Sequence, residues 1–131
     1  MTILLRIIAV CIGIATIYTA WWAVWFWSSG RFAALIATGL LGIFTLIGWI
    51  ATLVLGPFAT VQLWRFHLSG LWAATALAGF AAVYYLLGVL LFRAPNAPLF
   101  PILLAGAVNL FFLGVLLSPR ARATCRCARP N

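Results

Sequence analysis

The chain has 131 residues, of which 67% are hydrophobic and only 6% are charged. Its eight cationic side chains are all arginines, and it has neither aspartate nor glutamate, so its formal net charge is +8. This composition excludes a soluble globular domain, which could not bury so much apolar surface. The lack of carboxylates argues against proton relays, most metal sites and acid–base catalysis carried by this chain alone.

The first predicted membrane span covers residues 7–27, a stretch without a charged side chain. A helix rises about 1.5 Å per residue, so this stretch crosses the roughly 30 Å apolar core of a bilayer. No small-residue cleavage site follows the apolar run, so we expect the span to be retained. Indole rings favour the headgroup boundary, and we expect four tryptophans at the end of the span to lie there: Trp21, Trp22, Trp25 and Trp27.

Three further spans are predicted, over residues 32–55, 70–92 and 99–117. The first of these is expected to end at Gly56–Pro57, because proline lacks the N–H group and disfavours helix in the residue before it. A turn with two prolines at residues 94–98 separates the last two spans, and Ser118–Pro119 ends the fourth.

Two segments outside the spans are polar enough to lie at the membrane surface. Residues 57–69 carry apolar side chains at helical spacing and predict a short interfacial helix, with Trp64 in the boundary and Arg65 reaching headgroups. Residues 120–131 form a basic tail that we expect to be frayed, with Arg120 and Arg122 near lipid headgroups.

The pattern predicts an all-α fold, a single transmembrane domain over residues 1–119 made of two helical hairpins with short loops. Six arginines lie on the side of the two termini and the central loop, and two lie on the opposite side. By the positive-inside rule, both termini are expected in the cytoplasm. Arginines scattered singly between apolar runs indicate anionic lipid headgroups as partners, and no basic stripe favours nucleic acid.

Small residues at four-residue spacing mark the predicted contacts between helices, because in lipid they let backbones approach closely. These residues are Ala15, Thr19, Gly42, Gly48, Ala74 and Ala78. Such stripes predict a compact bundle, but they do not decide whether it is a monomer or an oligomer.

Two polar side chains are candidates for binding a cofactor, although no cofactor is expected. Asn109 is the only amide inside a span, and we expect it to form an interhelical hydrogen bond with Thr16, Thr45 or Thr75; a ligand contact is the alternative. His67 is the only histidine, and we expect it to be solvated at the interface rather than to ligate haem or chlorophyll.

The three cysteines indicate neither a disulfide framework nor a zinc site, because they are too few and poorly spaced. Cys11 lies in the first span, whereas Cys125 and Cys127 lie in the tail, where we expect them to be inert. No metal site is predicted.

Two stretches of the chain carry a family resemblance. The run from Gln62 to Arg65, followed by Gly70 to Ala74, resembles the central loop of small four-span bacterial membrane proteins to which no activity is assigned. The stretch from Asn109 to Arg122 is similar to their last helix and its arginine stop. The resemblance implies a bacterial inner-membrane protein, and it implies nothing about mechanism.

With no nucleophile–base pair in the sequence, we predict that the protein is not an enzyme. The leading hypothesis is an accessory or scaffold subunit of a larger membrane complex, in which an acidic neighbour pairs with the arginines. Other membrane subunits and a second copy of the chain are the candidate protein partners. The alternative is a binder or carrier of an apolar molecule between the helices: a quinone, a carotenoid or chlorin pigment, or a lipid. The absence of a membrane-embedded glutamate argues against proton-coupled efflux.

Overall fold

The computed structural model describes residues 1–91 and 99–127, and these ranges are helical apart from short turns. Four helices are long and apolar enough to cross a membrane, so the predicted all-α, four-span fold is confirmed. The predicted turn at residues 94–98 and the last four residues lie outside the described residues. The helices are α1 (Thr2–Ser28), α2 (Phe32–Ala37), α3 (Leu40–Trp64), α4 (Leu68–Leu91), α5 (Leu99–Leu117) and α6 (Pro119–Cys127).

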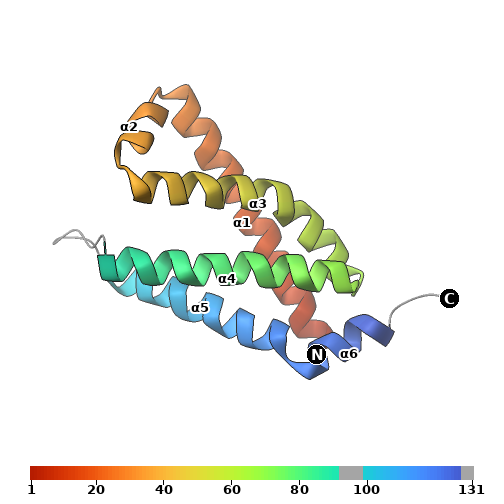
Figure 1. Ribbon diagram of the computed structural model, residues 1–131. Coiled ribbons are helices and arrows are strands. Elements are labelled where there is room, and N and C mark those ends of the chain that lie inside the picture. The colour runs from red at the N-terminus through yellow and green to blue at the C-terminus, as the bar shows by residue number, and fades with distance from the viewer. Residues whose placement is uncertain (92–98, 128–131) are drawn as a thin grey trace.

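The long helices pack mainly in chain order, α1 on α3, α3 on α4, and α4 on α5 (Figure 1). In Figure 1, α1 runs obliquely past the other long helices, and the N-terminus lies beside α6. We call this end of the bundle the α6 end and the opposite end, where α2 lies, the α2 end. The largest fully buried side chains belong to one cluster near the α6 end: Leu5, Ile8, Leu63, Leu71 and Leu116.

The predicted helix end at Gly56–Pro57 is wrong, because α3 continues through Pro57 to Trp64. Proline removes one backbone hydrogen bond and its ring crowds the carbonyl four residues earlier, and Figure 1 shows α3 bending over its last turns. Beyond the proline, Ala59 and Leu63 are fully buried. Burial of this face explains why the segment extends α3 instead of forming a separate interfacial helix.

The predicted continuous helix over residues 32–55 is also wrong, since the helix is interrupted between α2 and α3. Gly39 has a φ of +70°, which side-chain-bearing residues rarely adopt. Just before it, the Thr38 hydroxyl donates a hydrogen bond of 2.6 Å to the Leu35 carbonyl, which competes with continuation of the helix. The break folds α2 against the start of α3, and a Cβ on Gly42 would collide with the Leu35 carbonyl.

The predicted frayed tail is wrong over residues 120–127, which belong to α6. The Ser118 hydroxyl accepts a hydrogen bond of 3.2 Å from the Ala121 N–H, and Pro119 occupies the first helical position, where its missing N–H costs nothing. Ala121 and Cys125, one turn apart, are buried against the cluster at the α6 end. The arginines of α6 therefore project from a fixed helix.

The turn between α3 and α4 brings the two backbones unusually close. The His67 N–H donates to the Gln62 carbonyl at 2.8 Å and the Phe66 N–H donates to the Leu63 carbonyl at 3.0 Å, the paired bonds of a Schellman motif. Phe66 occupies its left-handed position, with a φ of +58°. Gly70 then lies against the backbone of Gln62 and Leu63, where a Cβ would not fit.

Candidate ligand cleft

Two adjoining cavities lie between the long helices. The first, which we call the aromatic cavity, has a volume of about 260 Å³ and lies between α1, α3 and α4. The second, the Asn109 cavity, has a volume of about 210 Å³ and also reaches α5. Both are lined by Ala15, Thr52, Leu77 and Ala81, so together they form one cleft.

Half of the residues that line the aromatic cavity carry aromatic rings. Trp22 from α1 and Trp49 from α3 face it together with Tyr18, Tyr84 and Tyr85. Neighbouring rings fix their positions, since Phe26 contacts both tryptophans, with centroid distances of 5.9 Å to Trp22 and 5.4 Å to Trp49. Rings held in this way offer a preformed stacking surface.

Small residues make room for the cleft. Ala15 and Thr19, predicted as helix contacts, line it on the α1 side, and Gly48 lines it on α3. The close approach of α1 to α3 lies elsewhere, at Gly56, where a Cβ would strike the Thr16 side chain.

The remaining predicted packing residues lie outside the aromatic cavity. Ala74 and Ala78 are buried on α4, and Ala78 lines the Asn109 cavity. Gly42 faces α2.

A hydrogen bond between α3 and α4 lies on the cavity wall. The Thr45 hydroxyl lies 2.8 Å from the Leu41 carbonyl, which can only accept, and 3.0 Å from the Tyr84 hydroxyl. Thr45 therefore donates to its own helix, and Tyr84 donates to Thr45. The Tyr84 oxygen keeps its lone pairs for a ligand.

Replacing Tyr84 with phenylalanine is expected to lower the free energy of unfolding by about 0.5–1.5 kcal/mol, because hydrogen bonds between membrane helices contribute on this scale. The measurement is unfolding in mixed micelles, with Thr45→Val and the double variant completing a thermodynamic cycle. A coupling of zero between the two positions would show that this bond does not join the helices.

Asn109 lies on the wall of the Asn109 cavity. The predicted interhelical hydrogen bond with a threonine is wrong. The Asn109 Nδ2 donates a hydrogen bond of 2.8 Å to the Ala105 carbonyl of its own helix. The three candidate threonines, Thr16, Thr45 and Thr75, likewise donate to carbonyls four residues earlier. Because only one Asn109 N–H is used in this bond, its Oδ1 and second N–H can serve a molecule in the cleft.

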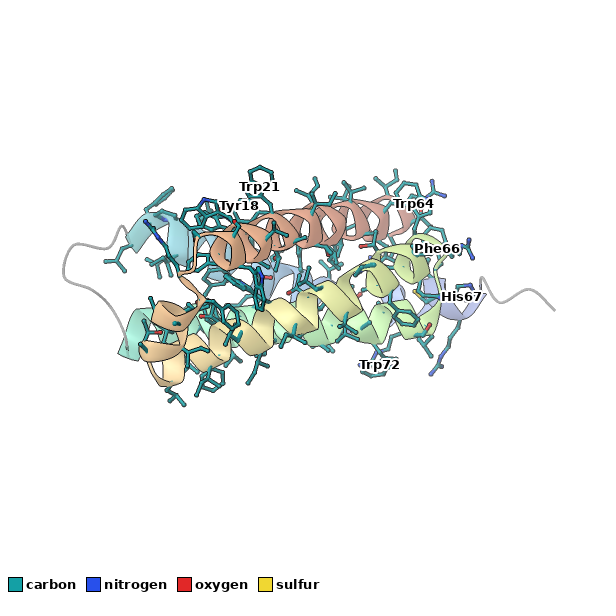
Figure 2. All side chains as sticks on the ribbon, turned by 90° about the horizontal axis from the view of Figure 1, so that it is seen from above. Tyr18, Trp21, Trp64, Phe66, His67 and Trp72 are labelled. Atoms are coloured by element: carbon teal, nitrogen blue, oxygen red, sulfur yellow. The ribbon has the colours of Figure 1, made fainter. Side chains whose placement is uncertain are left out.

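His67 does not line the cleft. It lies in the turn between α3 and α4 at the α6 end, next to Phe66 (Figure 2). Within the described ranges, no group of three or more histidine, cysteine or acidic side chains is placed to hold a metal ion.

The two cysteines whose side chains are described are both free thiols. Cys11 lines the Asn109 cavity. Cys125 is buried under α6, and this burial raises the pKa of its thiol, which favours the protonated, unreactive form.

The predicted interface residues divide between the lipid-facing surface and the cleft. Trp21 and Trp27 are more than 70% exposed, and Figure 2 shows Trp21 pointing away from the bundle. Trp22, by contrast, lines the aromatic cavity. Trp25 and Trp64 are partly exposed, and Arg65 and Arg120 are exposed at the α6 end. Arg122 is half-buried beside Trp72.

Sequence patterns did not single out the tyrosines of the cleft, and they indicated Thr19 and Thr45 only as a helix contact and as a hydrogen-bond partner of Asn109. Tyr84 and Tyr85 form a pair of phenols near the end of an apolar run, and Thr45 and Thr52 are spaced seven residues apart in the preceding run. Residues seven apart lie on one helix face, so this spacing was the sequence signal that could have placed both threonines on the wall of one site.

Comparison of the chain with known protein families, with curated proteins and with solved structures found no match. The resemblance to small four-span bacterial membrane proteins therefore stays a prediction. The fold and the side chains of the cleft carry the functional argument.

Proposed function

We propose that this membrane protein is not an enzyme and that it binds a neutral, ring-bearing, lipid-soluble molecule in the cleft. The observation that carries the proposal is the aromatic cavity, in which two tryptophans and three tyrosines from three helices surround open space. Pockets for small molecules are mostly apolar, with a few polar groups that fix orientation. The cleft has this composition.

The chemistry of the wall favours a ligand with carbonyl oxygens, such as a quinone. No charged side chain lines either cavity, so a charged ligand would lack a counterion. The indole N–H groups of Trp22 and Trp49 and the hydroxyls of Tyr18 and Tyr85 are hydrogen-bond donors, which suit carbonyl acceptors. A chlorin or haem would need an axial ligand such as His67, which lies outside the cleft, and a hydrocarbon carotenoid would use none of these donors.

The test is a titration of the purified protein in detergent with a short-chain benzoquinone, followed by tryptophan fluorescence. A bound quinone should quench Trp22 and Trp49 strongly, so Trp22→Phe and Trp49→Phe should each reduce the saturable quenching. Trp72→Phe is the matched control, because Trp72 lies at the α6 end (Figure 2). Quenching that does not saturate, or that depends on Trp72 as much as on Trp22, would contradict the proposal.

A second candidate function is an accessory subunit of a larger complex. The chain has eight arginines and no acidic side chain, so acidic groups that pair with them must come from outside the chain. Native gel electrophoresis of gently solubilised host membranes should then show the protein migrating with defined partners. A protein that always migrates alone would contradict this function.

We propose a bacterial plasma membrane as its location, with both termini in the cytoplasm. The support is the family resemblance and the excess of arginine on one side, six against two. A C-terminal green fluorescent protein fusion should be fluorescent in a bacterial host and a C-terminal alkaline phosphatase fusion inactive. The reverse result would overturn the orientation.

A further inference from the structure

We propose that the α6 end of the protein has two binding sites for anionic phospholipid headgroups, each built on an arginine held against aromatic rings. In the first, the Arg6 guanidinium carbon lies 5.3 Å from the centre of the Trp64 ring and 5.4 Å from that of Phe66. In the second, the Arg122 guanidinium carbon lies 5.4 Å from the centre of the Trp72 ring.

The fold places these two pairs on different sides of the same end. Figure 2 shows Trp64 and Phe66 on the side of α1, and Trp72 on the opposite side. Arg6 comes from the first turns of α1, whereas Arg122 projects from α6, whose Ala121 and Cys125 are buried beneath it. Both arginines are thus tied to the buried cluster that holds the α6 end together.

The geometry of each pair leaves the guanidinium ready to bind a phosphate. A guanidinium over an aromatic face is attracted by the ring, while its N–H groups point outward in its own plane. Those N–H groups match two oxygens of a phosphate. The tryptophan of each pair is partly exposed, Trp64 by 48% and Trp72 by 53%, as expected for a ring at the membrane boundary with acyl chains below it.

Charge decides the class of lipid. Arg65, Arg120 and Arg126 are exposed at the same end, so five arginines of the described ranges concentrate positive charge there, and the chain has no acidic residue to neutralise it. An anionic headgroup gains from this field, whereas a zwitterionic headgroup gains little. A lipid is favoured over an acidic protein partner because each guanidinium lies over a ring at the end of a membrane-spanning helix, where lipid phosphates are present.

The test is native mass spectrometry of the delipidated protein titrated with phosphatidylglycerol, with phosphatidylcholine as the zwitterionic comparison. We expect two binding events that are tighter for phosphatidylglycerol. Arg6→Gln and Arg122→Gln should each weaken one event about fivefold, and the double variant should weaken both. Circular dichroism of each variant checks that the helices are retained.

Arg31→Gln is the matched control. The Arg31 guanidinium carbon lies 5.1 Å from the centre of the Trp25 ring, so it forms the same kind of pair. It lies at the α2 end, where it is the only arginine among the described residues. We expect this variant to keep both tight events.

Four outcomes would overturn the proposal. The first is equal binding of the two lipids, and the second is a loss in Arg31→Gln as large as that in Arg122→Gln. The third is displacement of phosphatidylglycerol by inorganic phosphate at constant ionic strength, which would identify a site for soluble phosphate. The fourth is the absence of lipid selectivity together with a membrane protein that copurifies with wild type but not with the double variant. This result would identify an acidic protein partner.

Discussion

Replacing Gly70 with alanine is expected to lower the free energy of unfolding by about 3 kcal/mol, because the new methyl group has no room. A Cβ at this position would lie 2.5 Å from the carbonyl carbon of Gln62 and would also strike the amide nitrogen of Leu63. Backbone atoms cannot rotate away as a side chain can. The α3–α4 hairpin would have to open where Leu63 and Leu71 are buried.

Gly114→Ala is the matched control for this substitution. Gly114 also lies in a membrane helix, and a Cβ there would meet nothing within 4 Å. We expect its free energy of unfolding in mixed micelles to stay within about 0.5 kcal/mol of wild type. Equal stabilities of the Gly70 and Gly114 variants would contradict the close approach of α3 to α4.

Replacing Ala15 with phenylalanine is expected to weaken quinone binding at least about tenfold, because the ring would occupy the cleft itself. Ala15 lines both cavities, so a single substitution obstructs the junction between them. Filling a preformed cavity need not destabilise the fold, so binding should fall more than stability. The measurement is the fluorescence titration with short-chain benzoquinone, run beside unfolding of the same variant.

Ala76→Phe provides the comparison, since Ala76 is exposed on α4 and lines neither cavity. We expect it to bind quinone as wild type does. Ala81→Phe gives an independent check from the α4 side, because Ala81 also lines both cavities. Unchanged affinity in both the Ala15 and the Ala81 variant would place the quinone outside the cleft.

The four long helices were predictable because a span needs only a long apolar run, and each run is visible in the sequence. Residues 99–117 were predicted as the last span and match α5. The end of α5 follows from the local sequence, because Ser118 and Pro119 are residues that begin a new helix, α6. Burial of Ala74 and Ala78 on α4 also agrees with the stripe of small residues.

Features that depend on tertiary contacts were not predictable in the same way. Pro57 does not end α3, because burial of Ala59 and Leu63 favours a helix that bends and continues. The polar tail forms α6 because two of its small residues are buried in the cluster at the α6 end, where α6 packs on α4 and α5. In both segments, the free energy of packing outweighs the local sequence signal, which is a proline in α3 and a polar composition in α6.

The cleft could not be predicted from the sequence, because it depends on how the helices cross. The close approach at Thr16 and Gly56 fixes where α1 and α3 touch, while Ala15 and Thr19, on the same helix, face open space. A pattern of small residues cannot distinguish a contact from a cavity, because both need small side chains. The hydroxyls of Thr45 and Tyr84 became informative only once they were found together on the cavity wall.

The most direct test of the ligand-binding account is native mass spectrometry of the protein released from its own membrane in mild detergent, recorded together with its absorbance spectrum. The account predicts one neutral, ring-bearing molecule retained per chain, absent from Ala15→Phe and present in Ala76→Phe. A bare 14.3 kDa species from wild type, with no absorbance beyond that of its aromatic residues, would contradict it.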